Sequence, residues 1–468
     1  MTEHGDRTPV RTAVVGTPGD RRVTLFAAAC ARYGLPAPAV VPWTRVLRDE
    51  EIRIEPGTLV RIESPGQDAE ADALLRGPGR PTRAGGGAAW HAALTAGLER
   101  IRRAVARTPG AVLLADVDEI AVMFDKRRCH ARLAAAGVPV PPALPGPVGG
   151  YAELRERMDR AGWRRVFVKS AHGSSASGVV ALQVAGSRIK AVTSAELIRG
   201  GAAGAGPYEG ERAGSGPRGD GWAGGGPRGD GRTGGGPRGD GRAAVELHNS
   251  LRVRSYGDED EVAAIIDLLA ADGLHVERWF PKAGFGGRVI DLRVVTVGGT
   301  PTHAVVRAAR APMTNLHLGG VRGDLGAVRA RLGPRGWDRV LDACARAAAC
   351  FPGSLCAGVD VMVGADWRGV AVAEVNAFGD LLPGLTGLPG GAAEGLDTYA
   401  AQVRAVLARH VPAHPPAGAP AGRPSTGHPS AGHPSAGHPS AGHPSAGRSP
   451  ADHPSAGHAA VSHAAVTR

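Results

Sequence analysis

Two apolar runs between residues 356 and 376 each contain polar side chains whose oxygens could hold a cation. The runs flank a turn-like stretch at residues 364–369 and predict two antiparallel strands. A turn centred on Trp367 places Asp360 opposite Glu374, with Asn376 on the same face as Glu374. The other face would carry apolar residues that can pack on a core: Val359, Val361, Val363, Ala371, Ala373 and Val375.

Two interpretations of this hairpin remain open from its own residues. Opposed carboxylates repel each other unless a cation lies between them, and oxygen ligands of this kind suit Mg²⁺ held together with substrate phosphates. Acidic residues also commonly face water, so a surface hairpin that binds nothing is the alternative. Other segments of the chain must distinguish the two.

Lysine is rare in this chain, since only four of its 55 basic residues are Lys. A Lys retained against this background indicates a position that needs a compact ammonium group. Lys126 follows Asp125, a predicted helix N-cap, and Lys169 ends a predicted strand at residues 164–169. The loop at residues 172–178 is rich in Gly and Ser, whose N–H groups and hydroxyls suit phosphate oxygens. A flexible hairpin would use the same residues, so this loop alone is a weak signal.

A predicted strand at residues 288–299 carries charges among apolar residues. Asp291 and Arg293 share a face with Val289 and Val295. A buried Arg normally has an anionic partner, so we expect Arg293 to form an ion pair inside the fold.

The elements that must position these residues begin with an α/β domain at residues 1–124. Predicted strands at residues 11–16, 38–43 and 57–66 alternate with helices, which indicates a parallel sheet. Ligands of such sheets bind beyond the carboxyl ends of the strands. Arg21, Arg22, Arg61 and Glu63 fall there and are candidates for substrate contact, although ordinary polar loop residues would give the same pattern.

Two α+β segments follow, at residues 125–275 and 276–405. The first is interrupted at residues 200–242 by an insert that repeats a unit containing Gly-Pro-Arg-Gly-Asp. The chain ends, at residues 406–468, in a tail made largely of a repeat of His, Pro, Ser, Ala and Gly. Neither stretch has the apolar residues to bury a core, so both are predicted to be disordered.

The composition excludes several classes of partner. The net charge of +11 is spread along the chain, and no basic run is interleaved with aromatic residues, which argues against nucleic acid. No apolar stretch approaches the roughly 18 residues of a membrane span. The five cysteines show no CxxC spacing and no N-terminal apolar signal is apparent, so a cytoplasmic protein is expected.

Taken in order, these segments resemble the ATP-grasp superfamily over about residues 110–400. The resemblance implies a Rossmann-like pre-ATP-grasp domain followed by a two-subdomain ATP-grasp fold that holds ATP between its subdomains. The residues that carry it are Asp125 with Lys126, Lys169 with "HGSSASG", "VERWF", Asp291 with Arg293, Arg307, "TNLHLGG", Asp360 and "EVN".

The resemblance also implies a role for each matching residue. Mg²⁺ would be bound by Asp360, Glu374 and Asn376, and the transferring phosphoryl group would lie near Arg293, Arg307 and Asn315. Residues from Glu277 to Phe280 would form the hinge strand that binds adenine, chiefly through backbone groups. The full set of residues implied for ATP is Lys126, Lys169, Gly173, Ser174, Ser175, Glu277, Trp279, Phe280 and Lys282, the last at a position where many members carry an acid for the ribose.

Members of this family typically join a carboxylate to an amine or thiol through an acyl phosphate. The resemblance therefore implies an ATP- and Mg²⁺-dependent carboxylate–amine ligase acting on a small molecule or a peptide. A small-molecule kinase and a non-catalytic nucleotide-binding regulatory protein are the alternatives. The sequence predicts neither the identity of the substrates nor the oligomeric state.

Overall fold

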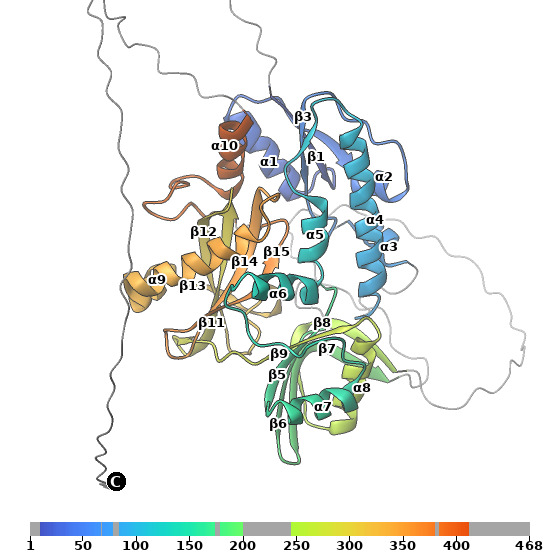
Figure 1. Cartoon of the computed structure of the whole chain (residues 1–468), viewed down its shortest axis with the longest axis vertical. Helices are drawn as coiled ribbons and strands as arrows, with labels where there is room; N and C mark the ends of the chain where they lie inside the picture. The colour runs from blue at the N-terminus through green and yellow to red at the C-terminus, as the bar shows by residue number, and fades with distance from the viewer. Residues whose placement is uncertain are drawn as a thin grey trace, which may run out of the picture. The chain divides into compact units, whose positions relative to one another are not determined.

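The computed structural model describes residues 10–66, 68–77, 84–173, 178–199, 245–379 and 383–410 (Figure 1). Within these ranges the chain forms three β-sheets accompanied by helices. The insert at residues 200–242 and all of the predicted tail beyond residue 410 lie outside the described residues. Of the helices in the described ranges, none is long and apolar enough to cross a membrane.

The first sheet is parallel, as the sequence predicts. Its strand order is β2-β1-β3-β4. Its strands are β1 (Arg11–Gly16), β2 (Ala39–Pro42), β3 (Thr58–Ile62) and β4 (Val112–Leu113). Its helices are α1 (Arg21–Arg32), α2 (Trp43–Leu47), α3 (Ala69–Arg76), α4 (Gly87–Ala106) and α5 (Val117–Met123). The apolar stripe of α4 is buried at Leu94, Leu98, Ile101 and Val105.

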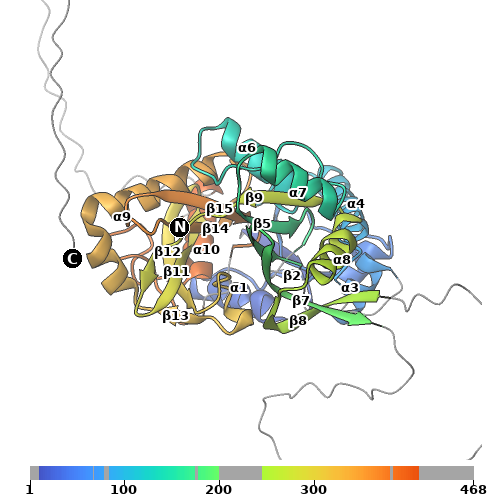
Figure 2. The same cartoon turned by 90° about the horizontal axis from the view of Figure 1, so that it is seen from below.

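The second sheet is antiparallel, with strand order β8-β7-β6-β5-β9. Its strands are β5 (Arg165–Ser170), β6 (Val180–Ala185), β7 (Arg188–Arg199), β8 (Val245–Tyr256) and β9 (Leu274–Arg278). Helices α7 (Tyr151–Arg160) and α8 (Glu259–Ala270) pack beside it (Figure 2). Val166 and Val168 of β5 join their cluster, while Phe167 between them belongs to a separate cluster with Met313. This alternation is what a strand buried on both faces requires.

The third sheet has the path β13-β12-β11-β14-β15, with β10 paired to β11. Its strands are β10 (Gly284–Phe285), β11 (Arg288–Val297), β12 (Thr300–Ala309), β13 (Val321–Gly323), β14 (Cys356–Val363) and β15 (Val370–Asn376). A short 3-10 turn, η1 (Leu316–Leu318), precedes β13. Helix α9 (Leu325–Ala349) is kinked at Gly333, which has a φ of 65° and precedes Pro334. Pro lacks the N–H that a continuous helix needs, so the helix bends there.

The β14–β15 pair has the predicted register at the residues that matter to the site. Asp360 pairs with Glu374, and Gly358 pairs with Asn376. Trp367 in the turn adopts a left-handed φ of 58°, and nearer the turn Val363 pairs with Val370, one residue out of the register of these two pairs. The prediction that the two carboxylates face each other is therefore confirmed.

A β-bulge changes the rest of the hairpin. Val361 pairs with Val372, so Ala373 has no partner on β14. The predicted apolar face is wrong at this point, because Val372 joins the cluster of Val359 and Val361, whereas Ala371 is buried outside that cluster and Ala373 is only half-buried. The bulge also turns the backbone of Ala373 out of the regular ladder, beside Glu374.

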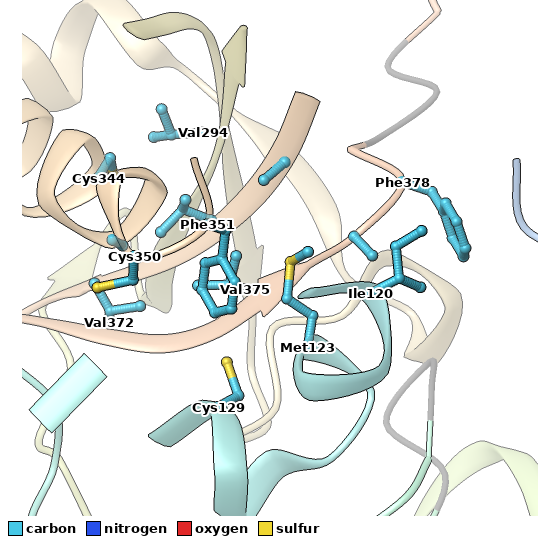
Figure 3. Close-up of a cluster of buried hydrophobic side chains, with 14 of the residues drawn as sticks. Ile120, Met123, Cys129, Val294, Cys344, Cys350, Phe351, Val372, Val375 and Phe378 are labelled. Atoms are coloured by element: carbon cyan, nitrogen blue, oxygen red, sulfur yellow. The ribbon is translucent and has the colours of Figure 1, made fainter. Parts of the chain in front are cut away.

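Helix α6 (Lys126–Ala135) lies against β15 and starts as predicted. The Asp125 carboxylate accepts hydrogen bonds from the backbone N of Arg127 at 3.0 Å and caps the helix. Cys129 is buried and points toward Val372 and Val375 of β15 (Figure 3). This packing fixes the position of Lys126 next to the acidic face of the hairpin.

The last described helix, α10 (Thr398–His410), continues through residues 406–410, which the sequence assigns to the tail. Its Tyr399 and Val403 pack with Val14, Phe26 and Cys30 of the first domain. The last described helix therefore completes the core of the first domain, and it extends past the predicted boundary at residue 405.

Candidate active site

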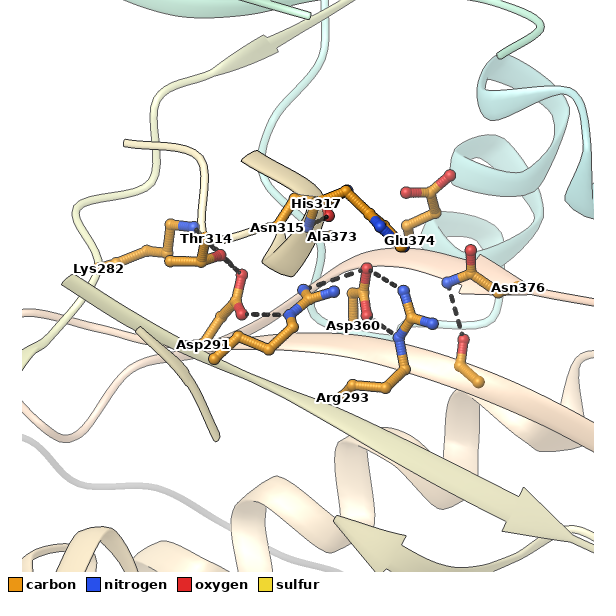
Figure 4. Close-up of polar contacts among 12 residues, drawn as sticks. Lys282, Asp291, Arg293, Thr314, Asn315, His317, Asp360, Ala373, Glu374 and Asn376 are labelled. Carbon is orange, nitrogen blue, oxygen red and sulfur yellow. Dashed lines mark hydrogen bonds and ion pairs between the residues drawn. The ribbon is translucent and has the colours of Figure 1, made fainter. Parts of the chain in front are cut away.

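The three predicted metal ligands lie together on one face of the β14–β15 pair (Figure 4). Asp360 is buried, whereas the side chain of Glu374 is 30% exposed. The Asn376 amide donates from Nδ2 to the carbonyl oxygen of Gly358 at 3.1 Å. That contact leaves Oδ1 of Asn376 with no donor from the described residues.

Two guanidinium groups hold Asp360. Arg293, its cross-strand neighbour on β11, donates from Nη2 to Oδ2 at 3.0 Å and from Nε to Oδ1. Arg307 Nη2 lies 3.2 Å from the same Oδ2. Burial opposes ionisation of Asp360, but the two Arg residues outweigh it and hold its pKa below the usual value. The expected anionic partner of Arg293 is therefore Asp360.

A second buried carboxylate, Asp291, extends this network. Arg307 donates from Nε to Asp291 Oδ1 at 2.8 Å, and Lys282 Nζ lies 3.2 Å from Oδ2. Thr314 Oγ donates to Asp291 and accepts from Lys282 at 3.0 Å. Burial works against the charge of Asp291, yet Arg307 and Lys282 keep its pKa well below the usual range.

Lys282 is thus engaged inside the protein, although the resemblance placed it among the residues that contact ATP. Its side chain is 9% exposed, and burial lowers its pKa despite the nearby Asp291. Thr314 begins the quoted TNLHLGG motif, but the sequence predicted no role for it, because its contact with Asp291 joins segments 23 residues apart. Only the fold brings the two together.

Lys126 and Lys169 converge on the bulged segment of β15. Lys126 Nζ lies 3.2 Å from Glu374 Oε1 and also donates to the carbonyl oxygen of Gly173. Lys169 Nζ lies 3.5 Å from the carbonyl oxygen of Ala373. One ammonium group comes from helix α6 and the other from strand β5, so the two lysines meet the acidic face from different elements.

Glu277 is the main counter-ion of Lys169, a role that the sequence did not predict. Its carboxylate oxygens lie 2.7 and 2.8 Å from Lys169 Nζ, and His275 Nε2 lies 2.8 Å from Oε1. Burial opposes the charge, but Lys169 and His275 hold the pKa of Glu277 at about 2. The backbone around Glu277 pairs with Phe167 of β5 on one side and bridges to Ala143 on the other.

The two residues after β9 that the resemblance implies for adenine, Trp279 and Phe280, are aromatic and less buried than Glu277. Trp279 is half-buried and stacks obliquely on Phe167, with ring centroids 4.8 Å apart. Phe280 follows and is also half-buried. Met313, before η1, and Leu318, the last residue of η1, belong to the same apolar cluster as Trp279.

Asn315 and Gly173 make contacts within the protein, whereas two serines of the loop after β5 are not described. The Asn315 side chain accepts from the backbone N of His317 at 2.8 Å and caps η1, so its oxygen is already used. Gly173 is described, and its carbonyl oxygen accepts from Lys126. Ser174 and Ser175, which the resemblance assigns to phosphate binding, lie outside the described residues.

His172 starts the quoted HGSSASG stretch, but its contacts were not predicted from the sequence. Its Nε2 lies 3.2 Å from Asp125 Oδ2, and its ring stacks on His91 with centroids 4.3 Å apart. No element of the sequence pattern links residue 91 to residue 172, so the contact could not have been foreseen. It ties the root of the loop to the N-cap of α6.

The substrate candidates of the first domain separate into buried and exposed groups. Arg21 is exposed on the first turn of α1. Arg61 and Glu63 are 5% and 1% exposed, and Arg61 donates from Nε to Glu63 Oε1 at 2.7 Å. The Arg61 guanidinium also lies over the rings of Phe26 and Tyr399, at 5.0 and 5.4 Å from their centroids, so its contacts are inside the protein.

The fit of a magnesium ion can be judged from the donors present. Glu374 and Asn376 supply a half-exposed carboxylate and an amide oxygen without a donor, and both are hard ligands that suit Mg²⁺. Asp360 fits less well, since both of its oxygens are engaged by guanidinium groups. Within the described ranges no group of three or more His, Cys, Asp or Glu is placed to hold a metal. A cation here therefore depends on Asn376 and on oxygens from a ligand.

No protein-family model matches this chain, and no curated protein does. Among solved structures it is similar to D-cycloserine synthetase DcsG, at 16% identity and a TM-score of 0.46 over 85% of this chain and 99% of that one. It is also similar to the ATP-grasp ligase PsnB complexed with a minimal precursor, at 17% identity and a TM-score of 0.43 over 86% and 100% of the two chains.

A third similar structure is the D-alanine–D-alanine ligase from Bacillus anthracis complexed with ATP, at 12% identity and a TM-score of 0.39 over 79% and 87% of the two chains. ATP-grasp ligases are the family that the sequence motifs resemble. At these levels of identity and TM-score the likenesses assign no role to any residue here.

Proposed function

We propose that this chain is an ATP-grasp enzyme, a ligase that uses ATP and Mg²⁺ to join a carboxylate to an amine or thiol. One observation carries the proposal. Lys126 and Lys169, from two different elements, bring their ammonium groups to Glu374 and to the carbonyl oxygen of Ala373. A magnesium-bound triphosphate needs cations on one side and oxygen ligands on the other, and this arrangement offers both.

The two lysines would bind the phosphates of ATP. A triphosphate would compete with Glu374 for Lys126 and with Glu277 for Lys169, because both lysines have carboxylate partners within 3.2 Å. The N–H groups of the loop that contains Gly173 would supply further donors to the phosphates. The adenine would lie against Trp279 and Phe280.

Glu374 and Asn376 would hold Mg²⁺, with phosphate oxygens completing its ligands. When bound, the ion neutralises charge on the phosphates and draws their oxygens into one geometry. Asp360 would bind Mg²⁺ only if one of its contacts with a guanidinium group were broken.

Arg307 and Arg293 would stabilise the phosphoryl group as it moves. Arg307 uses Nε and Nη2 for Asp291 and Asp360, and its Nη1 makes no hydrogen bond to a described residue. Burial lowers the pKa of Arg307, but Asp291 and Asp360 outweigh it and raise that pKa, so the positive charge is permanent. A fixed cation of this kind is suited to charge that develops in a transition state.

The reaction would run in two steps. A carboxylate oxygen of the substrate bonds to the γ-phosphorus while the bond to the β,γ-bridging oxygen breaks, which releases ADP. The amine nitrogen then bonds to the acyl carbon, phosphate leaves with the carboxyl oxygen, and the nitrogen loses a proton. We place this reaction on a small-molecule or peptide carboxylate in the cytoplasm, without nucleic acid.

The test is to incubate the full chain with ATP, Mg²⁺ and a metabolite extract while following ADP, phosphate and new masses. Release of ADP and phosphate that depends on both a carboxylate and an amine supports the ligase. A stable phosphorylated product without ligation would instead identify a kinase. ATP binding without any turnover would contradict both and indicate a regulatory protein.

A further inference from the structure

The carboxyl edge of the parallel sheet contains a buried carboxylate oxygen with no hydrogen-bond donor. Glu63 directly follows β3, and its backbone N donates to the carbonyl oxygen of Val15 on β1 at 2.9 Å. Oε1 of Glu63 accepts from Arg61, whereas Oε2 is buried and accepts from no described residue. Leaving such an oxygen unsatisfied is costly, so its position calls for a reason.

Glu63 cannot turn toward another partner, because Arg61 is itself fixed. The Arg61 guanidinium lies between two aromatic rings and also donates to Gln402 of α10. Arg61 Nε and Nη2 both lie 2.7 Å from Glu63 Oε1. These contacts hold the Glu63 carboxylate in one position, with Oε2 outside the ion pair with Arg61.

The group that faces Oε2 is the guanidinium of Arg22. Arg22 Nη1 lies 3.8 Å from Glu63 Oε2, beyond hydrogen-bond distance, and donates to the carbonyl oxygen of Phe378 at 3.3 Å. Its side chain is 25% exposed, so it is open to a ligand. The nearby Asp20 carboxylate is already engaged, since it accepts from the backbone N of Arg22 at 2.7 Å.

The charges in this region favour an anionic ligand. Arg61 and Glu63 neutralise one another at 2.7 Å, which leaves the charge of Arg22 with no described carboxylate in hydrogen-bond distance. The Thr17 hydroxyl, just after β1, is also buried and has no hydrogen-bond partner among the described residues. A guanidinium can donate two parallel hydrogen bonds to a carboxylate, so Arg22 matches a carboxylate ligand.

The position of Arg22 connects this region to the proposed reaction. Phe378, whose carbonyl oxygen contacts Arg22, lies two residues beyond Asn376. The same backbone segment therefore carries a proposed Mg²⁺ ligand and the contact with Arg22.

We propose that Arg22 receives a carboxylate of the ligase substrate, and that Glu63 is a positioning residue that orients the Arg22 guanidinium. This inference rests on the proposed function. It assigns recognition of the carboxylic acid to the first domain, through α1 and the ends of β1 and β3. Arg61 takes part only by holding Glu63 in place.

The experiment uses the full chain with Mg²⁺, ATP and hydroxylamine as a general amine. A panel of the twenty protein amino acids, succinate and trialanine supplies the carboxylate, and ADP and hydroxamate are measured. For every carboxylate that the wild type accepts, Arg22→Gln should raise the KM by about 10- to 100-fold, the value of a charged hydrogen bond. The KM for ATP should change less than twofold, and Arg22→Lys should recover part of the loss.

Arg32→Gln is the matched control, because it removes the same charge from the exposed far end of α1. It should leave both KM values unchanged. An unchanged carboxylate KM in Arg22→Gln would overturn the inference while the ligase function stands. If no carboxylate of the panel supports ADP formation by the wild type, the proposed function is contradicted and the inference falls with it.

The positioning role of Glu63 has its own readout. Glu63→Gln should raise the carboxylate KM, and the double variant with Arg22→Gln should show no further increase, because both changes act on one contact. Thermal unfolding monitors whether Glu63→Gln folds. Independent, multiplicative effects of the two changes on KM would contradict the positioning role.

Discussion

Asp360 and Glu374 face each other across the β14–β15 pair, and each carboxylate has cations of its own. Arg293 and Arg307 hold Asp360, whereas Lys126 reaches Glu374 from helix α6. Two opposed carboxylates would repel each other without these partners. The pairing therefore explains both why the polar residues are tolerated on this face and how they could exchange cations with a ligand.

Glu374→Gln should lower Mg²⁺-dependent ADP formation by at least about 100-fold, since even outer partners of a metal ligand are worth 10- to 100-fold. The free energy of unfolding should change little, because the side chain is partly exposed. Activity and urea unfolding are measured in parallel with Glu156→Gln, an exposed control. Full activity in Glu374→Gln would remove this residue from the metal site.

The Lys169–Glu277 pair should combine a structural and a functional role. Lys169→Met leaves the buried Glu277 carboxylate without its main counter-ion and should cost about 3–5 kcal/mol of unfolding free energy. The double variant Lys169→Met with Glu277→Gln should recover most of that stability, because the unpaired charge is gone. It should remain inactive, since no ammonium group is left for the phosphates. Recovery of ADP formation in the double variant would show that Lys169 serves stability alone.

Acidification should unfold the protein partly through Glu277. Its folded pKa of about 2 lies below its ordinary value of 4.5, so the stabilisation is complete above pH 4.5 and is lost as the pH falls toward 2. His275, whose pKa is lowered chiefly by burial, acts in the same direction below pH 6.5. Urea midpoints at pH 7, 5 and 3 should fall more steeply for the wild type than for Glu277→Gln. Equal slopes would contradict this assignment.

Arg61→Met should destabilise the first domain, because it leaves the buried Glu63 without its partner. The expected loss is about 3–5 kcal/mol of unfolding free energy. Arg53→Met is the contrasting variant, since Arg53 forms an ion pair with Glu51 that is exposed to water and should matter little. Similar unfolding midpoints for the two variants would mean that the Arg61–Glu63 ion pair does not stabilise the fold.

The β14–β15 hairpin shows how much of the site the local sequence pattern can predict. The pairing of Asp360 with Glu374 is predicted from a turn centred on Trp367, but the observed turn pairs Val363 with Val370 and would by itself set Asp360 opposite Ala373. The bulge at Ala373 shifts the register by one residue and brings Glu374 opposite Asp360. That bulge was not predictable, because one extra residue on β15 leaves the periodicity of the apolar run almost unchanged. That bulge places a carbonyl oxygen beside Lys169, which no local rule indicates.

The partners of the charged residues lie beyond what spacing can show. Lys169 meets Glu277 across 108 residues, and Arg61 meets Gln402 across 341. The sequence around Arg61 is also compatible with an ordinary polar residue near a loop. In the structure, however, Phe26 of α1 and Tyr399 of α10 cover its guanidinium. Spacing along the sequence does not distinguish a buried ion pair from a surface residue that contacts substrate.

A crystal structure of the full chain with Mn²⁺ and a non-hydrolysable ATP analogue tests the central claim most directly. The account predicts an anomalous peak bonded to Glu374 and Asn376, with phosphate oxygens within hydrogen-bond distance of Lys126 and Lys169. A nucleotide bound elsewhere, or a metal peak remote from both Glu374 and Asn376, would contradict it.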